Sequence, residues 1–371
     1  MAAEQGLSLS ALDRRSLLKT MGAAAIGISL GGGLAACQRV DGNLPEDKEE
    51  ARLNFYNWDT YIGENSLADF KKSTGIEVAM DLFDSNDALF AKFNAGNPGY
   101  DLIVPSNDFV ERMVRADMLM PLDHQKIPNF QKNIDPTYQN VPYDPGRKFS
   151  MPYTWLALGI GYRKSRVAAP PESWKSLFDS DQYSGRIAWL SEAGDMFRLY
   201  GKYLGKSVNH LNAADIRAIE AMMIRQKPHI AKFHGDDGQY LLLRGDCDLV
   251  IETNGDIAQV MALDDDIAFI MPKEGGQLNS DNLCIPKNAP HPQNAHNFIN
   301  YLLDAEVGKH ISEMILYPTP NLAAKALMPA SYRDNEVIFL PDEILARCEY
   351  YSFDPDVQAL YEQAFSRVRA A

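Results

Sequence analysis

The chain has 371 residues, with 36 Lys and Arg against 50 Asp and Glu, which gives a formal net charge of −14. This acidic balance argues against nucleic acid or an anionic membrane surface as a partner, and it is compatible with a cationic ligand. The length exceeds that of one typical hydrophobic core, so we expect two lobes. The widely spaced cysteines do not form a disulfide framework, and the apolar runs around Cys247 and Cys284 predict buried thiols.

The N-terminal segment has the pattern of an export signal. The twin arginine Arg14-Arg15 precedes a moderately apolar run over 21–34, and Leu34-Ala-Ala-Cys37 follows. A charged region, an apolar region and small residues before a cleavage point are typical of secretory signals. The segment resembles a twin-arginine signal joined to a lipoprotein cleavage box, which implies removal of residues 1–36 and lipid attachment at Cys37. In the alternative reading, a secreted protein is cleaved elsewhere and Cys37 has no role.

The next stretch, 37–51, is polar and charged with Gly and Pro, as expected of a tether. No later segment is long and apolar enough to cross a membrane, so any membrane attachment would be through lipid. After the tether, strand patterns at 52–58, 76–83 and 100–105 are each followed by a helix pattern, from 67 and over 86–93 and 109–116. Such βα repeats indicate a parallel sheet.

Around Met151–Trp155 the chain changes character, and here we expect it to pass from one lobe to the other. Beyond this point helices and strands continue to alternate. Helices are expected at 173–178, 195–204, 212–226, 256–263, 295–303 and 306–314, and strands at 247–252, 267–272 and 282–286.

The end of the first strand is a candidate ligand site. Trp58 and Tyr61 lie at the junction between this strand and the helix that follows. Open α/β sheets bind ligands at the carboxyl ends of their strands. Ordinary core packing is the alternative explanation for these rings.

Three stretches, read together, carry a family resemblance. They are Phe55-Tyr-Asn-Trp58, Tyr100-Asp-Leu-Ile-Val-Pro-Ser106 and Tyr317-Pro-Thr-Pro-Asn-Leu-Ala-Ala324. Met151-Pro-Tyr153 and Pro272-Lys-Glu-Gly-Gly276 fall in the same order between them. Over roughly residues 52–325 the chain resembles the periplasmic polyamine-binding proteins of ABC importers.

The resemblance implies an α/β fold of the two-lobed periplasmic-binding-protein type (type II-like), with a ligand cleft at the hinge. Residues 52–155 and 280–325 would form one lobe, and 156–279 and 326–371 the other. It also implies a monomer that captures a putrescine- or spermidine-like polyamine and delivers it to an ABC permease in the inner membrane. We expect no catalysis, no cofactor, no metal site and no nucleic-acid partner.

A polyamine is an apolar chain with an ammonium group at each end. Burial of each ammonium requires carboxylates and hydrogen-bond acceptors, whereas the methylenes favour aromatic walls. The resemblance implies that Trp58, Tyr61 and Tyr317 are ring walls and that Ser106 helps to place an amine. It implies that Glu192 and Asp195 hold one terminal ammonium, that Asp281 takes the other charged nitrogen, and that Asp256 is a further acid of the putrescine-type members.

Each of these residues also has a structural alternative. Trp58 and Tyr317 would then pack between lobes. Asp195 would be an acid favoured by a helix N-terminus, Asp256 a helix N-cap and Asp281 a turn residue.

The sequence departs from the family at three positions. Thr253 and Asn279 stand where the family usually has tryptophan, and Asp108 stands where it usually has an aromatic residue. The loss of rings weakens stacking on the ligand's methylenes, and the additional acid adds negative charge. We count Asp108 among the candidate ligand contacts. The ligand would then be shorter, more polar or more highly charged than spermidine, or the site would simply be weaker.

Other function classes have less support in the sequence. There is no Gly-x-Ser-x-Gly or His-Glu-x-x-His motif, and the seven histidines lack metal-ligand spacing. Gly201–Ser207 is one residue short of a phosphate-binding loop and ends a helix pattern instead of following a strand. The alternatives left open are a sensor, or a binding protein of the same fold for agmatine, another amine or ferric ion.

Overall fold

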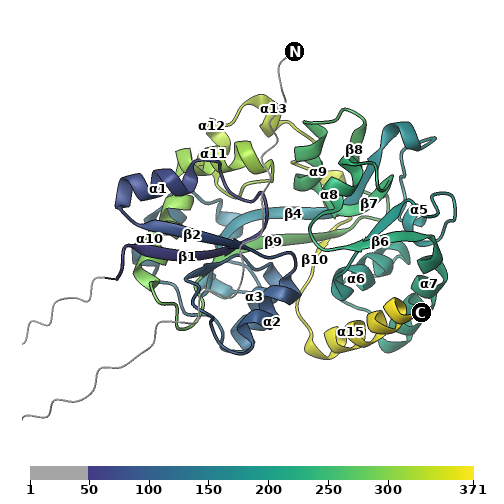
Figure 1. The fold of residues 1–371 in the computed structure, drawn as a ribbon, viewed down its shortest axis with the longest axis horizontal. Coiled ribbons are helices and arrows are strands. Elements are labelled where there is room, and N and C mark those ends of the chain that lie inside the picture. The colour runs from purple at the N-terminus through teal and green to yellow at the C-terminus, as the bar shows by residue number, and fades with distance from the viewer. Residues whose placement is uncertain (1–48) are drawn as a thin grey trace, which may run out of the picture. The chain divides into compact units, whose positions relative to one another are not determined.

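The computed structural model of the protein describes residues 49–371 and shows helices packed on both faces of a mixed β-sheet (Figure 1). The strands follow the order β2-β1-β3-β9-β4-β7-β5-β6, with β10 paired to β9 and β8 paired to β4. The strands are β1 (Arg52–Asn57), β2 (Glu77–Leu82), β3 (Leu102–Ile103), β4 (Ser150–Arg163), β5 (Ile187–Leu190), β6 (Ile230–His234), β7 (Leu249–Thr253), β8 (Ile267–Ile270), β9 (Gln277–Cys284) and β10 (Glu349–Tyr350). The α-helices are α1 (Ser66–Thr74), α2 (Asn86–Phe93), α3 (Asn107–Arg115), α4 (Pro128–Asn133), α5 (Lys175–Phe178), α6 (Ala193–Tyr203), α7 (Ala213–Gln226), α8 (Gly238–Leu243), α9 (Asn254–Met261), α10 (Pro292–Leu302), α11 (Ala305–Ile315), α12 (Leu322–Leu327), α13 (Ala330–Arg333), α14 (Asp342–Leu345) and α15 (Pro355–Ala370).

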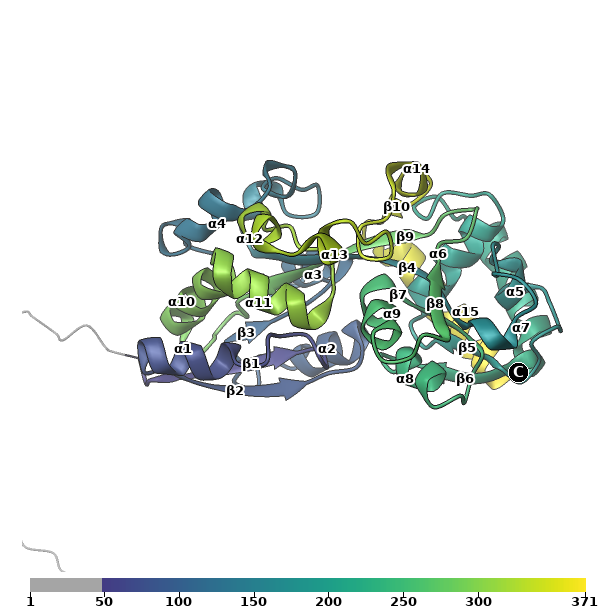
Figure 2. The ribbon, with the colours of Figure 1, turned by 90° about the horizontal axis from the view of Figure 1, so that it is seen from above.

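Two neighbouring strands, β4 and β9, join two groups of elements (Figure 2). The first half of β4, from Ser150 to Ala157, pairs with β9, and the second half, from Leu158 to Tyr162, pairs with β7. The group that contains β1, β2 and β3 is the first lobe, and the group that contains β5, β6 and β7 is the second lobe. The fold is therefore the expected two-lobed α/β arrangement.

Each lobe has its own hydrophobic core, and β4 contributes to both. Met151 and Leu156 pack in the core of the first lobe, whereas Leu158 and Ile160 pack in the core of the second. Every residue of β4 except Arg163 is buried. The strand therefore passes from one core to the next over a few residues.

Side-chain alternation along β1 explains why helices cover both faces of the first-lobe strands. Leu53 and Phe55 pack with residues of α1, α10 and α11. The next residue, Tyr56, packs with residues of α2 and α3. Because successive strand residues point to opposite faces, one short strand supports two helical layers.

The sheet is parallel around β1 and around β5, and it is antiparallel along β4, including the pairing of β4 with β8 in the second lobe. β1 runs parallel to β2 and β3, as the βα repeats predicted. β5 runs parallel to β6 and β7, although the sequence analysis did not predict β5 or β6 as strands. By contrast, β9 is antiparallel to β3 and β4, and β4 is antiparallel to β7. These two strands lie outside the βα repeats that predicted a parallel sheet, and they carry the chain between lobes instead of returning through a crossover helix.

Most predicted elements are confirmed, with ends that shift by a few residues. The helix Asn86–Phe93 has the predicted bounds, and the helix predicted at 109–116 begins earlier, at Asn107. The strand predicted at 282–286 is wrong in its bounds, because β9 starts at Gln277. All of β9 is buried although Asn279-Ser-Asp-Asn282 is polar, so hydrophobic periodicity does not reveal this strand.

The C-terminal segment packs against the second lobe. α15 packs on α6 and α7, and its Phe365 and Val368 belong to the core of the second lobe. Cys247, Cys284 and Cys348 are free and buried, which confirms the burial predicted for the first two.

The export signal expected at 1–36, the lipidation site expected at Cys37 and most of the tether expected at 37–51 lie outside the described residues. Within residues 49–371, no helix combines the length and the apolar character needed to cross a bilayer.

Candidate functional site

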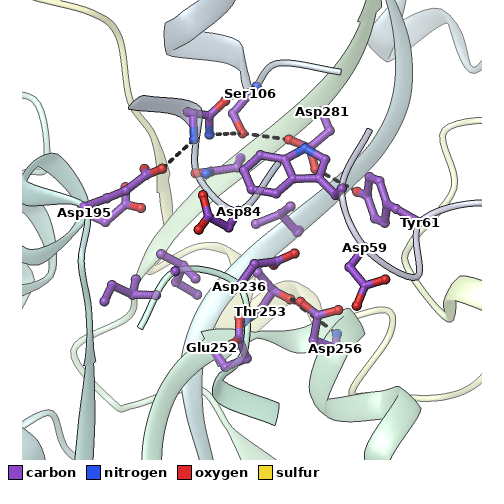
Figure 3. A pocket seen from close by; sticks show the side chains of 18 of the residues that line it. Asp59, Tyr61, Asp84, Ser106, Asp195, Asp236, Glu252, Thr253, Asp256 and Asp281 are labelled. Atoms are coloured by element: carbon purple, nitrogen blue, oxygen red, sulfur yellow. Dashed lines mark hydrogen bonds between the residues drawn. The ribbon is translucent and has the colours of Figure 1, made fainter. Parts of the chain in front are cut away.

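A cavity lies between the two lobes and encloses about 620 Å³ of empty space, including the part open to solvent (Figure 3). Its walls come from the segments after β1, β2 and β3 in the first lobe and from the ends of β5, β6 and β7 in the second. This is the edge at which parallel sheets bind ligands. The lining residues are Trp58, Asp59, Tyr61, Asp84, Asn86, Ser106, Leu156, Leu158, Leu190, Glu192, Asp195, Gly235, Asp236, Glu252, Thr253, Asp256, Asn279, Asp281 and Tyr317.

Acidic side chains dominate this lining. Eight of the lining residues carry carboxylates, and none of them is Lys, Arg or His. Gathering so many carboxylates away from water is unfavourable without a compensating cation. The cavity can therefore hold a positively charged ligand and would repel an anion. The eight are Asp59, Asp84, Glu192, Asp195, Asp236, Glu252, Asp256 and Asp281.

Asp281 is held by two hydroxyl groups of the first lobe. Ser106 Oγ donates to Oδ1 and the Tyr61 hydroxyl donates to Oδ2, each at 2.7 Å. The Tyr61 hydroxyl also contacts the Thr154 hydroxyl. Burial raises the pKa of Asp281 to about 6, while the two hydrogen bonds act in the opposite direction. Asp281 lies within β9, so the turn explanation for this residue is wrong.

Asp256 has a matching pair of hydroxyl donors. The Thr253 hydroxyl donates to Oδ2 at 2.8 Å and the Tyr317 hydroxyl donates to the same oxygen at 2.7 Å. Thr253 is the N-cap of α9 and accepts from the backbone N–H of Asp256, so the N-cap explanation for Asp256 is wrong. Burial raises the pKa of Asp256 to about 6.

Gly255, which directly precedes Asp256 at the start of α9, leaves room for Tyr317 to reach Asp256. A Cβ atom built on Gly255 would lie 2.1 Å from the ring of Tyr317. Only glycine leaves room for the ring above the start of α9. Within Thr253-Asn-Gly-Asp256, Thr253 therefore caps the helix, Gly255 leaves room for the Tyr317 ring, and Asp256 supplies the carboxylate.

A hydrogen-bonded chain links Glu192 in the second lobe to Asp281. The backbone N–H of Asn86 donates to Glu192 Oε1 at 2.8 Å, and the Asn86 side chain donates to Ser106 Oγ at 3.0 Å (Figure 3). Ser106 then donates to Asp281. Burial, followed by repulsion from Asp195, raises the pKa of Glu192 well above its usual range.

Asp195 occupies the first turn of α6, next to Glu192. It accepts from Gln277 Nε2 at 2.6 Å, and Arg198 lies 3.3 Å from it. Its position in the first turn of the helix fits the alternative in which a helix N-terminus favours an acid, and Asp195 also lines the cavity. Both descriptions therefore hold for this residue.

Aromatic rings form part of the wall. Trp58 Nε1 donates to the Val104 carbonyl oxygen at 2.9 Å, and the Trp58 ring lies 4.3 Å from that of Phe83. The Tyr61 and Tyr317 rings meet edge to face at 4.8 Å. Because the polar atom of Trp58 is already bonded, its ring is the part left to contact a ligand.

Of the predicted site residues, Asp108 is the one that does not line the cavity. Its carboxylate accepts from the Tyr351 hydroxyl at 3.1 Å and lies 3.7 Å from Arg198. Burial raises the pKa of Asp108 to about 6, although the positive charge of Arg198 acts in the opposite direction. Because α3 already begins at Asn107, the helix turns Asp108 toward Arg198 behind the wall. The structure brings together the other predicted residues, which are Trp58, Tyr61, Ser106, Glu192, Asp195, Asp256, Asp281 and Tyr317.

The sequence interpretation missed several lining residues. Asp59 directly follows Trp58, Asp84 precedes α2, and Asp236 follows β6. Glu252 was assigned to a strand and given no role. Each of these acids lies at the end of a strand, so the rule that singled out Trp58 would have found them. Within residues 49–371, no group of three or more His, Cys, Asp or Glu has the geometry of a metal site.

Comparisons with known proteins agree with this geometry. Residues 65–338 match the family described as bacterial extracellular solute-binding proteins. The chain is 33% identical to the putrescine-binding periplasmic protein PotF of Escherichia coli, over 87% of this chain and 92% of that one. It is 31% identical to the spermidine/putrescine-binding periplasmic protein of the same organism, over 91% and 95%.

Solved structures show the same fold. The substrate-binding protein PotD of a Streptococcus pneumoniae spermidine/putrescine ABC transporter superposes with a TM-score of 0.72 at 30% identity, over 86% of this chain and 98% of that one. The TpPotD lipoprotein of Treponema pallidum superposes with a TM-score of 0.75 at 26% identity, over 86% and 100%. The chain therefore belongs to the family of bacterial extracellular solute-binding proteins.

Proposed function

We propose that the protein captures a polyamine outside the cytoplasm and delivers it to an ABC transporter permease. The observation that carries this proposal is the cavity lined by eight carboxylates and by no cationic side chain. A ligand with ammonium groups on an apolar chain satisfies both the acids and the aromatic wall. The names of the relatives, which are putrescine- and spermidine-binding proteins, support the same ligand class.

Each end of the ligand would meet a prepared carboxylate. Asp281, oriented by Ser106 and Tyr61, would take one charged nitrogen. Glu192 and Asp195 would hold a terminal ammonium from the second lobe. The methylenes would then run along the rings.

Asp256 would supply a further carboxylate to the ligand. The hydroxyls of Thr253 and Tyr317 hold it in place at the start of α9. Because both hydroxyls donate to the same oxygen, Oδ2, the other oxygen remains to accept from the ligand. The Tyr317 ring would lie beside the methylenes, as Trp58 would from the first lobe.

Capture would follow from closure of the two lobes. Carboxylates from both lobes share one cation, so the ligand binds the closed state more tightly than the open one. Contacts such as the hydrogen bond between Asn86 and Glu192 already join the lobes in this structure. The closed protein would then dock on the permease, and other subunits would hydrolyse ATP. The chain itself would catalyse no reaction.

The cellular location is part of the proposal. Several relatives are named as periplasmic proteins, and the T. pallidum relative is a lipoprotein. We infer export through the twin-arginine signal at 1–36 and lipid attachment at Cys37, with the protein acting as a monomer. The lobe boundaries near residues 155, 280 and 325 also stay a prediction, which the separate cores on either side of Leu156 and Leu158 support.

Thermal unfolding of the purified protein tests the function. A ligand that binds only the folded state at about 100 times its Kd stabilises it by about 2.7 kcal/mol, which raises the Tm by several degrees. We expect this rise with putrescine, spermidine, spermine or agmatine. Amino acids and ferric citrate serve as controls. A rise with one of these controls and with none of the amines would contradict the proposal.

A further inference from the structure

The guanidinium of Arg198, on α6 of the second lobe, lies between two carboxylates that come from different lobes. It is 3.3 Å from Asp195 on its own helix and 3.7 Å from Asp108 on α3 of the first lobe. The side chain of Arg198 is 6% exposed and that of Asp108 is 4% exposed. A buried charge is costly without a partner of opposite sign. The contact between Asp108 and Arg198 therefore compensates both groups and joins the lobes away from water.

The C-terminal segment supports this contact. The centroid of the Tyr351 ring lies 3.6 Å from Arg198 Cζ, and the Tyr351 hydroxyl donates to Asp108 Oδ1 at 3.1 Å. The backbone oxygen of Tyr351 accepts from Asn107 Nδ2 at 2.9 Å, which fixes the segment to the start of α3. A guanidinium over an aromatic ring is attracted to the face of that ring. Tyr351 thus holds both members of the ion pair in place.

The ion pair lies behind the cavity wall, next to a residue that faces the ligand. Asp195 lines the cavity, whereas Asp108 and Arg198 do not. With an amine bound, Asp195 would serve two cations, which are the guanidinium behind it and the ammonium in front. Asp108 supplies the guanidinium with a second carboxylate, so Asp195 retains more of its attraction for the ammonium. The aromatic residue that the family usually has at position 108 carries no charge and could not do this.

We propose that the ion pair between Asp108 and Arg198 is a latch that holds the two lobes closed around the ligand without touching it. This inference rests on the proposed function, in which closure captures the ligand. When the lobes separate, Asp108 leaves with α3, while Arg198 keeps Asp195 because both lie on α6. The closed form therefore contains an interaction that the open form lacks, and this difference raises the affinity for the ligand. Asp108 and Arg198 are thus positioning residues.

The variant Asp108→Asn tests the latch, because it removes the charge and keeps an oxygen that can accept from Tyr351. We expect the Kd for spermidine to rise about tenfold, an effect within the range of close charge pairs at interfaces. The pair forms after the ligand has entered, so dissociation should become faster while association changes little. Calorimetry gives the Kd, and stopped-flow tryptophan fluorescence gives the two rate constants. The Tm of the unliganded variant should not fall.

A second substitution separates the ion pair from a direct contact with the ligand. Without the guanidinium the latch has nothing to hold, so in the Arg198→Gln background Asp108→Asn should change the Kd by less than about twofold. Glu220→Gln is the matched control, because it breaks a pair with Arg367 within the second lobe and should leave the Kd unchanged. If Asp108→Asn does not fold, Tyr351→Phe removes the hydroxyl that holds Asp108 and should weaken binding in the same way.

Each contrary outcome has a defined meaning. Wild-type affinity in Asp108→Asn, or in Tyr351→Phe where it replaces that variant, would overturn the inference and leave polyamine binding in place. An equal loss of affinity with and without Arg198 would show that Asp108 acts on the ligand directly and would also overturn it. Slower association with unchanged dissociation would do the same, because the pair would then act before closure. Failure of the wild type to bind spermidine would overturn the proposed function together with the inference.

Discussion

The backbone N–H of Asn86 in the first lobe donates a 2.8 Å hydrogen bond to Oε1 of Glu192 in the second. Asn86 is the first residue of α2, where backbone N–H groups lack a partner within the helix. Its side chain bonds to Ser106, which donates to Asp281. This contact between the lobes therefore places a carboxylate of the second lobe on a polar chain that orients a carboxylate of the first.

Glu192→Gln should weaken polyamine binding by about 10- to 100-fold, because it removes a buried charge from the ligand's surroundings. The amide oxygen of the new side chain can still accept from Asn86, so the unliganded protein should keep its fold. Calorimetry gives the affinity and circular dichroism checks the fold. Glu343→Gln, at an exposed site on α14, is the control and should bind as the wild type does. Unchanged affinity in Glu192→Gln would remove this residue from the proposed site.

Asp281→Asn should also weaken binding by about 10- to 100-fold, since Ser106 and Tyr61 hold this carboxylate where a charged nitrogen would lie. The variant should not lower the Tm of the unliganded protein at neutral pH. Burial raises the pKa of Asp281 to about 6, which means that the ionised carboxylate is disfavoured in the folded state. A variant that unfolds, or that binds with wild-type affinity, would contradict this assignment.

Sequence reasoning singled out residues that line one cavity where ligand chemistry and strand position coincide. Trp58 and Tyr61 follow a strand that is readable from its aromatic alternation, and both line the cavity. Glu192, Asp195 and Asp281 were inferred from family resemblance, and the structure places all three in the same cavity.

The same reasoning failed where tertiary structure overrides local pattern. β9 is a polar sequence buried between β3 and β4, and its pairing with β4 makes it a strand. Asp108 has the same spacing from Ser106 as a family aromatic, yet the helix turns it toward Arg198.

Gly235→Ala should hinder closure while leaving each lobe intact. A Cβ atom at Gly235, in the second lobe, would lie 2.6 Å from the backbone oxygen of Asp84 in the first. In an open form this contact does not exist, so the unliganded Tm should change little, whereas affinity should fall about tenfold or more. Small-angle scattering should show less compaction on addition of spermidine than in the wild type. Wild-type affinity with full compaction would show that the lobes close without this contact.

The buried carboxylates also predict how pH acts on stability and binding. Burial raises the pKa values of Asp281 and Asp256 to about 6, from ordinary values near 4. Between about pH 4 and pH 6 these groups bind more protons in the folded protein than in the unfolded chain, so their contribution to the unfolding free energy falls as pH rises. Burial lowers the pKa of His234 to about 4, and burial also lowers the pKa of His296. These two groups change stability in the opposite direction.

The effect of Asp281 can therefore be isolated by comparing the wild type with Asp281→Asn. The stability of the wild type relative to the variant should fall from pH 4 to pH 6 and stay constant above, as measured by thermal unfolding.

Ligand binding should show the reverse trend, because a polyamine binds the ionised carboxylates: spermidine affinity in the wild type should rise between pH 5 and pH 7.5. Calorimetry at pH 5.5 in two buffers of different ionisation enthalpy should detect protons released on binding, and fewer for Asp281→Asn. Equal proton release by the two proteins would show that Asp281 is already ionised before the ligand arrives.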